Sequence, residues 1–353
     1  MNTWRTMQRR LVDVALAQRA ELAAQLSRTP AGAAALISGI QYEAFLRQQQ
    51  RCSMTALSMA TGIRTQHQRW AHLEAAERAR LAPDRAARGP GTPHVFWHGP
   101  DRQTDAARQL VVFVNGWTVS GLVWPKDVVS HIGQTCDVVR IDNRGTGYSR
   151  TAPAPFTIAT MADDVAAVVR AFGARSATIV GLSMGGMIAQ ELALRHPHLV
   201  DRLVLCGTRP PAPVGFVAAD AVIEATMTPP RAGESLSEYL ARSWRGVLGP
   251  GFAERRPEAF VELIDQIGQR PTPHAAVMTQ LRAIAAWHGA HRLARISAPT
   301  TVIHGTDDPL IPVGNGMRLA QMIPGATYIE LPGIGHVVPF EAPDVLIAQL
   351  TTA

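Results

Sequence analysis

The segment Ala177-Thr-Ile-Val-Gly181-Leu-Ser183-Met-Gly185-Gly186 places one serine at the junction of two different sequence patterns. Ala177–Leu182 is a short and nearly continuous apolar run, which is typical of a strand buried on both faces. A helical pattern begins near Met184. The glycines on both sides of Ser183 allow neighbouring backbone to approach without a Cβ clash. We therefore predict a strand, a sharp turn at Ser183 and a helix.

Apolar runs of similar length recur on both sides of this segment and alternate with helical patterns. Most of these runs are rich in Val, Ile and Leu, and they are His94–His98, Gln109–Asn115, Asp137–Asp142, Ala177–Leu182, Arg202–Cys206, Thr300–His304 and Thr327–Leu331. The helical patterns lie at about residues 157–172, 185–196, 314–323 and 341–350. The alternation predicts an α/β fold, with a mostly parallel central sheet and helices on both faces.

Two segments interrupt the alternation. Residues 210–298 hold several helical stretches and turn clusters, so we expect a helical insertion after the strand that ends at Cys206. Residues 1–88 carry amphipathic helical patterns and few strand formers, and Arg88-Gly-Pro-Gly-Thr-Pro93 has the composition of a linker. We predict three parts: a helical N-terminal extension at residues 1–88, a core at residues 89–209 and 299–353, and the helical insertion at residues 210–298.

The positive net charge belongs to the N-terminal part. Residues 1–93 carry 13 arginines and 6 acidic residues, whereas the rest of the chain carries 21 basic and 22 acidic residues. Because these arginines are scattered and no nucleic-acid motif is present, we expect solvated helix faces and no nucleic-acid partner. The apolar members of these helices, such as Trp4, Leu11, Phe45 and Trp70, need cover from water. We predict that the helices pack on the core or on a second copy of the chain, which would give a homo-oligomer, and a membrane surface is the weaker alternative.

Composition excludes several classes of protein. Hydrophobic residues make up 46% of the chain and charged residues 18%, as in an ordinary globular protein. No apolar run reaches the roughly 18 residues that a transmembrane helix needs, and the N-terminus lacks the pattern of a secretory signal. The three cysteines have no metal-ligand spacing. We expect a cytoplasmic protein with no transmembrane segment, no metal and no cofactor.

A serine hydroxyl becomes a good nucleophile only when a base takes its proton, and histidine is the usual base. Among the 12 histidines, His336 follows the last predicted strand in Leu331-Pro-Gly-Ile-Gly-His336. Loops at the carboxyl ends of strands are where open α/β sheets place ligands. His304 lies inside a predicted strand, so we expect it to pack or to hydrogen-bond locally. We predict that Ser183 is the nucleophile and His336 its base.

A histidine base needs a carboxylate that fixes its tautomer and stabilises its positive charge. The predicted strand Thr300–His304 runs into a turn with two adjacent acids, Asp307 and Asp308, and either could serve. The reaction also needs backbone N–H groups that stabilise a developing oxyanion. We predict that the Met184 N–H and the Trp117 N–H form this oxyanion hole, because they follow Ser183 and the strand Gln109–Asn115 respectively.

Residues from about 93 to 350 resemble the α/β-hydrolase fold superfamily. The resemblance rests on the G-x-S-x-G sequence around Ser183 and on Asp142-Asn-Arg-Gly-Thr-Gly-Tyr-Ser149, which is similar to the D-x-R-G-x-G-x-S loop of that family. The family often has His-Gly after its third strand, where this chain has Asn115-Gly116. The resemblance implies the order Ser, Asp, His, favours Asp308 over Asp307, and places a helical cap at residues 210–298.

The resemblance implies a serine hydrolase that cleaves a carboxylic ester, lactone or thioester through an acyl-serine intermediate. The alternatives are an acyltransferase, a perhydrolase or a carbon–carbon bond hydrolase with the same triad, and a non-catalytic binding protein on the same fold. We expect a small acyl substrate that is largely apolar, since the cap holds several large apolar side chains, although plain core is the commoner role for these. They are Phe216, Met227, Tyr239, Trp244, Phe252, Met278 and Trp287.

Overall fold

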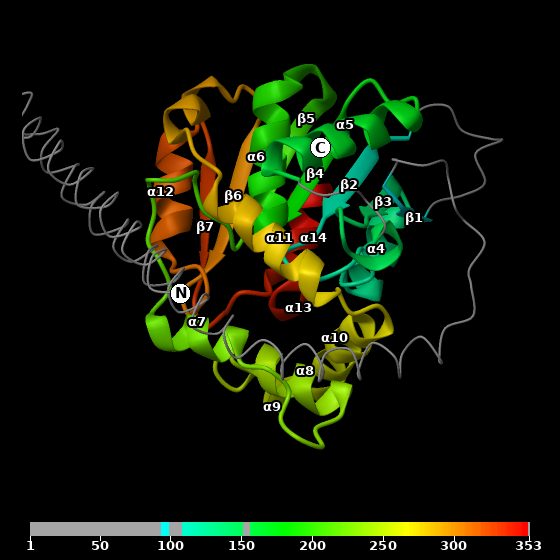
Figure 1. Ribbon diagram of the computed structural model, residues 1–353. Helices are drawn as coiled ribbons and strands as arrows, with labels where there is room; N and C mark the ends of the chain where they lie inside the picture. Colours follow the sequence, from blue (N-terminus) through cyan, green and yellow to red (C-terminus); the bar gives the residue numbers. More distant parts are fainter. Residues whose placement is uncertain (1–92, 99–107, 151–155, 352–353) are drawn as a thin grey trace, which may run out of the picture. The chain divides into compact units, whose positions relative to one another are not determined.

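Seven strands form one sheet in the computed structural model of the protein, which describes residues 93–98, 108–150 and 156–351 (Figure 1). The strands are β1 (Val95–His98), β2 (Leu110–Val114), β3 (Asp137–Ile141), β4 (Ala177–Leu182), β5 (Val200–Cys206), β6 (Thr300–Gly305) and β7 (Thr327–Leu331). Their order in the sheet is β1-β3-β2-β4-β5-β6-β7, and β1 alone runs antiparallel to its neighbour. Each of the seven predicted runs is therefore a strand, and the α/β prediction is confirmed. The predicted N-terminal extension lies outside the described residues.

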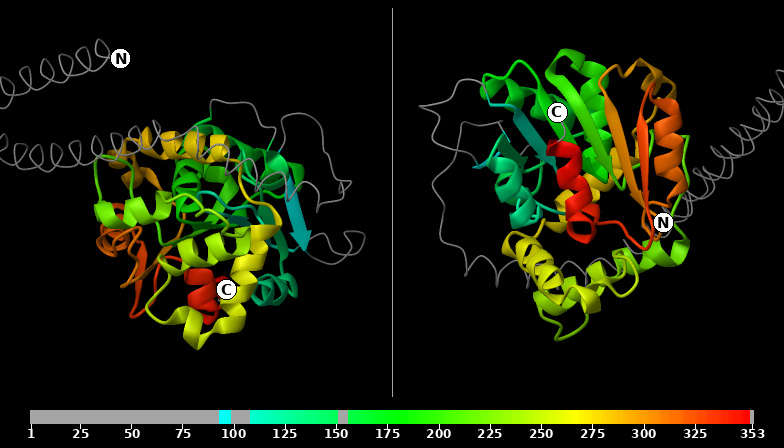
Figure 2. Two further views of the ribbon diagram at one scale, coloured as in Figure 1. Left: turned by 60° about the horizontal axis from the view of Figure 1, so that its bottom comes forward. Right: turned by 180° about the vertical axis from the view of Figure 1, so that it is seen from behind.

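Helices cover both faces of the sheet (Figures 1 and 2). One face packs against α5 (Ile158–Ala171), α6 (Met184–Arg195) and α12 (Gly314–Met322). The other packs against α4 (Lys126–Gly133) and α14 (Pro343–Thr351), and α14 follows the short α13 (Val338–Glu341). The four predicted helical patterns all correspond to helices. Helix α4 was not predicted, because it is only two turns long and buries just Val128, Val129, Ile132 and Gly133.

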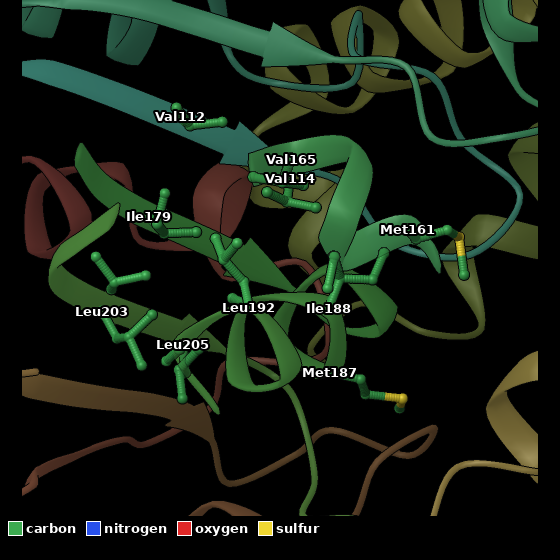
Figure 3. Packing of buried hydrophobic residues seen from close by; sticks show 14 of the residues in the cluster. Val112, Val114, Met161, Val165, Ile179, Met187, Ile188, Leu192, Leu203 and Leu205 are labelled. Carbon is green, nitrogen blue, oxygen red and sulfur yellow. The ribbon is translucent and has the colours of Figure 1, made fainter. Parts of the chain in front are cut away.

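Alternation along the strands divides the core into two layers. Val112 and Val114 of β2 pack in the layer under α5 and α6, together with Ile179 of β4 (Figure 3). Val111 and Phe113 of the same strand pack in the opposite layer, with α4 and α14. Because both faces of the central strands are buried, their sequences are almost uniformly apolar, and this is why the strands could be located from the sequence.

The cap segment, residues 210–298, connects β5 to β6 with five α-helices. They are α7 (Asp220–Met227), α8 (Leu236–Arg245), α9 (Phe252–Arg255), α10 (Pro257–Gln269) and α11 (His274–Ala285). Helices α8, α9 and α10 lie beyond the carboxyl ends of the parallel strands (Figure 1). Short 3₁₀ turns complete the described structure at Gly147–Ser149, Pro197–Leu199 and Ala290–Arg295. The predicted insertion is thus helical, while its role as a separate domain stays a prediction.

Within the described ranges, the helices are too short or too polar to cross a bilayer.

The packing of α6 on the sheet gives a first test. Ile188 of α6 is fully buried among strand side chains (Figure 3). We predict that Ile188→Ala lowers the free energy of unfolding by about 2–5 kcal/mol, because it removes buried contacts and leaves a cavity. Val261 of α10 is 56% exposed, so Val261→Ala should change this energy by less than about 0.5 kcal/mol. Guanidinium unfolding followed by circular dichroism would measure both, and equal effects would contradict the assigned packing.

Candidate active site

Ser183 occupies a sharp turn between β4 and α6. Its backbone has φ 55° and ψ −118°, a conformation that residues other than glycine rarely adopt. The turn is tight because backbone packs on bare backbone around it. A Cβ at Gly185 would lie 1.9 Å from the Val114 carbonyl oxygen, and a Cβ at Gly181 would lie 2.6 Å from the Gly185 carbonyl oxygen. The predicted strand, turn and helix are confirmed, and larger residues at these two positions would force the turn apart.

Hydrogen bonds from the neighbouring strand hold the turn in place. The Ser183 N–H donates to the Cys206 carbonyl oxygen at 2.9 Å. The Thr208 hydroxyl donates to the Ser183 carbonyl oxygen at 2.7 Å and is fully buried. On the other side, the register of β2 with β4 pairs Val114 with Gly181 and so brings Gly116 beside Ser183. These contacts hold the strained backbone in place and offset its conformational cost, which is about 1–3 kcal/mol.

His336 lies in the loop between β7 and α13 and contacts an acid from the loop after β6. Its Nδ1 is 2.8 Å from Oδ2 of Asp308, and both residues are buried. The other oxygen of Asp308 accepts the N–H groups of Leu310 and Ile311 at 2.9 and 2.8 Å, which orients the carboxylate. Asp307 instead accepts a hydrogen bond from the neighbouring Thr306 hydroxyl. Of the two acids that the sequence left open, Asp308 is therefore the one that touches the imidazole.

The surroundings of Asp308 favour its ionised form. Burial alone would raise the pKa of Asp308, but the charge of His336 and hydrogen bonds from His304 and His336 outweigh burial and hold this pKa at about 2. His304 is fully buried, with Nε2 2.7 Å from the Ile311 carbonyl oxygen and 3.4 Å from the Asp308 carboxylate. The predicted local hydrogen bond of His304 is confirmed. Its approach to Asp308 was not expected, because the side-chain directions in the turn could not be read from the sequence.

A second buried carboxylate, Glu341 of α13, organises the loop that carries His336. One oxygen accepts the N–H groups of Gly249 at 2.7 Å and Gly335 at 3.0 Å, and the other accepts the Val337 N–H at 3.0 Å. Burial raises the pKa of Glu341 despite these three bonds. The His336 N–H donates to the Val247 carbonyl oxygen at 2.8 Å. Sequence reasoning missed Glu341, which sits in an ordinary helical pattern with no mark of its partners.

The two predicted oxyanion-hole residues follow neighbouring parallel strands, β2 and β4. Neither the Trp117 N–H nor the Met184 N–H donates a hydrogen bond to another described residue. Trp117 lines the same cavity as Ser183. The loop at residues 142–149 supports the segment that carries Trp117, because the Asn143 side chain donates to the Asn115 carbonyl oxygen at 2.8 Å. Asp142 in turn accepts the Gly121 N–H at 2.7 Å and the Tyr148 N–H at 2.8 Å.

Ser183 and His336 line one cavity of about 160 Å³ beneath the cap segment. Among the described residues that line it there is no Lys, Arg, Asp or Glu. Of the large apolar cap residues named from the sequence, three line the cavity: Tyr239, Trp244 and Met278. Phe252 and Trp287 are buried elsewhere in the core, and Phe216 is 57% exposed. Their helical spacing could not separate the two roles, because a core side chain and a pocket side chain are equally apolar.

Within the described ranges, no group of three or more His, Cys, Asp or Glu side chains is placed to hold a metal ion.

Comparison with known proteins identifies the relatives of this chain. Residues 109–343 match the sequence profile of the alpha/beta hydrolase fold. A putative non-heme bromoperoxidase of Mycobacterium tuberculosis is 29% identical over 241 residues, which cover 67% of this chain and 90% of that protein. A 3-oxoadipate enol-lactonase of Acinetobacter baylyi is 28% identical, covering 67% of this chain and 85% of that protein. The solved enol-lactonase of Burkholderia xenovorans has a TM-score of 0.60 and 26% identity, over 73% of this chain and 94% of that chain.

The low pKa of Asp308 predicts a pH-dependent contribution to stability. Because the folded-state pKa of about 2 lies below the ordinary 3.8, the stabilisation is present above pH 3.8 and is lost as the pH falls toward 2. We expect this contribution to be on the order of 2 kcal/mol. Unfolding by urea at several pH values would measure it, since the stability gap between the native chain and Asp308→Asn should narrow below pH 4. A gap that is constant with pH would contradict the assigned environment.

Proposed function

The chain belongs to the α/β-hydrolase fold family and is a hydrolase, and on that premise we propose that it cleaves an uncharged carboxylic ester, lactone or thioester through an acyl-serine intermediate. One observation carries this proposal: His336 holds a 2.8 Å contact with Asp308 while it lines the same cavity as Ser183. We assign Ser183 as nucleophile, His336 as base, Asp308 as the acid that orients the base, and the Trp117 and Met184 N–H groups as the oxyanion hole.

The first half of the reaction uses the tautomer of His336 that the carboxylate selects. The Nδ1–H of His336 donates a hydrogen bond to the Asp308 carboxylate. The ring therefore has a free lone pair on Nε2, with which it accepts the Ser183 proton. The serine oxygen attacks the substrate carbonyl, and the two backbone N–H groups stabilise the negative charge on the carbonyl oxygen. His336 then gives its proton to the departing alcohol, enol or thiol, leaving an acyl group on Ser183.

The second half repeats these steps with water. His336 takes a proton from a water molecule, the hydroxide adds to the acyl carbon, and Ser183 leaves with the proton returned by the ring. The ionised Asp308 stabilises the imidazolium at each step, and its low pKa keeps it ionised near neutral pH. The products are a carboxylic acid and an alcohol or thiol, or a hydroxy acid if the substrate is a lactone.

The cavity supports a substrate without charge. A charged group would lose its hydration there and find no Lys, Arg, Asp or Glu among the described lining residues, which include two histidines, His274 and His336. Aliphatic and aromatic side chains form most of the wall, with Tyr239, Trp244 and Met278 on the cap side. Apolar acyl or alcohol groups would bind by burial of their surface. Lactonases and methylesterases stand among the relatives, but their names leave this chain's own substrate open.

Acyl transfer, perhydrolysis and carbon–carbon bond hydrolysis need the same residues, and we rank them second. They differ from ester hydrolysis in the group that receives the acyl unit or leaves from it. Product analysis in water, with and without an added alcohol, amine or hydrogen peroxide, separates them. Predominant formation of the acceptor adduct at millimolar acceptor would replace hydrolysis as the main activity.

Removal of the nucleophile should abolish activity. We expect Ser183→Ala to lower kcat on p-nitrophenyl esters by up to about 10⁶-fold, because triad members act as a unit. A fluorophosphonate should label the native chain at Ser183 and leave Ser183→Ala unlabelled, as judged by intact mass. Ser243 lines the same cavity and provides the control: Ser243→Ala should be labelled normally. Stoichiometric labelling of Ser183→Ala would refute the assignment.

The two neighbouring acids should differ in their effect on turnover. We expect Asp308→Asn to lower kcat by about 10⁴-fold, because an amide no longer selects the working tautomer of the histidine. Asp307→Asn should retain most activity, since the Asp307 carboxylate bonds the Thr306 hydroxyl while Asp308 bonds His336. In the native chain, kcat/KM should fall on acidification as His336 becomes protonated and stops accepting the serine proton. Equal losses in the two variants, or a flat pH profile, would contradict these roles.

A further inference from the structure

Thr118, the residue after Trp117, has a backbone conformation that its side chain disfavours. Its φ is 70°, and apart from Ser183 it is the only non-glycine residue with positive φ in the described part of the chain. A β-branched side chain in this region is a true outlier, with a cost of about 1–3 kcal/mol. Such a conformation persists only when surrounding contacts fix it. Within the loop that carries the Trp117 N–H, the Asn115 side chain donates to the Val119 carbonyl oxygen, and further contacts come from outside the loop.

Gln280 of α11 supplies one of these partners. Its Oε1 accepts the Thr118 N–H at 3.2 Å, and its Nε2 donates to the Arg144 carbonyl oxygen at 3.0 Å. The side chain is fully buried. The orientation of the amide is fixed by chemistry, because a backbone N–H can only donate and a carbonyl oxygen can only accept. Gln280 thus bridges two loops at the carboxyl edge of the sheet from within the cap segment.

Both ends of this bridge are anchored. Arg144 forms a two-pronged ion pair with Asp164 of α5, with Nη2 2.8 Å from Oδ1. One turn earlier on α11, the Val277 carbonyl oxygen accepts the Trp117 indole N–H at 2.9 Å. Trp117 is therefore held by its ring on one side and by the following peptide on the other, and both contacts come from α11.

We infer that Gln280 is a positioning residue for the oxyanion hole: it holds the Trp117–Thr118 peptide in the strained conformation that aims the Trp117 N–H at the reacting carbonyl oxygen. This inference rests on the proposed acyl-serine chemistry. Its consequence is that the cap segment takes part in transition-state stabilisation as well as in shaping the cavity. An N–H that is displaced by a fraction of an ångström still permits substrate binding but stabilises the oxyanion less.

The test compares two buried glutamines of the cap segment. Gln280→Met keeps the size of the side chain and removes the bridge, whereas Gln266→Met alters a glutamine whose side chain, among the described residues, donates to Glu262 of the same helix, α10. We expect Gln280→Met to lower kcat and the rate of Ser183 phosphonylation by about 10–100-fold, with KM changed less than about threefold, as a partial loss of one oxyanion donor predicts. Gln266→Met should leave both rates within about threefold of the native values. Equal rates in the two variants would overturn the inference.

A double substitution tests the route of the effect. Glycine adopts positive φ at little cost, so the loss caused by Q280M should be several-fold smaller when T118G is also present than when Thr118 is kept. The same loss in both backgrounds would overturn the inference, because the strained conformation would then not be what Gln280 maintains.

Gln280→Glu provides a second test of the positioning role of Gln280 if Gln280→Met does not fold. A protonated carboxyl has one donor and one acceptor and reproduces the bridge, whereas a carboxylate cannot donate to Arg144. The activity of Gln280→Glu relative to the native chain should therefore fall as the pH rises, and a ratio independent of pH would overturn the inference. Phosphonylation of the native chain separates the two proposals. If the native chain is not labelled at Ser183, the acyl-serine mechanism itself fails; if it is labelled and the variants match the control, only the role of Gln280 fails.

Discussion

A serine at φ 55° can exist only where its surroundings hold it, and here those surroundings are made largely of bare backbone. The Gly185 position lies so close to the Val114 carbonyl oxygen that no side chain fits, and Gly181 meets the first turn of α6 in the same way. This close packing presses the start of α6 against β2 and β4. The position of the Ser183 hydroxyl, the free N–H of Met184 and the approach of Gly116 all follow from that one contact between strand, turn and helix.

The site contains both strained backbone and buried carboxylates, and surrounding contacts stabilise each of them. Ser183 and Thr118 both have positive φ, and they follow strands that pair with each other in the sheet. Asp308 and Glu341 are both buried carboxylates near His336, yet the pKa of the first is lowered and that of the second is raised. The difference has a physical cause: Asp308 faces two imidazoles at close range, whereas the backbone amides bonded to Glu341, together with the charge of His336, offset burial of Glu341 only in part. Asp308 thus contacts the imidazole of His336, and Glu341 bonds the loop that carries it.

Residues whose type is itself informative could be predicted from the sequence. The buried strands are uniformly apolar, Ser183 stands between glycines, and His336 follows a strand, so each was singled out before its contacts were known. Asp307 and Asp308 follow the same strand, and the family resemblance, not their spacing, favoured Asp308. The residues that support them carry no such mark. Glu341 and Gln280 look like ordinary helix positions, and α4 is too short to show a clear period. Their roles depend on contacts between segments far apart in the chain, for example 136 residues for Gln280 and Arg144. Local pattern holds no information about such contacts.

The hydrogen bonds around Gly249 bear on how such an enzyme changes its specificity. Gly249 and Val247 belong to the cap segment, yet they bond Glu341 and His336 of the core. A Cβ at Gly335 would lie 2.3 Å from the Gly249 nitrogen, so the two segments of the chain meet without side chains between them. Residues 247–249 are bonded directly to Glu341 and to the loop that carries His336, so they cannot move outward without displacing His336. Exchange of cap helices between relatives, in evolution or by design, would therefore succeed only with junctions that leave residues 247–249 in the recipient.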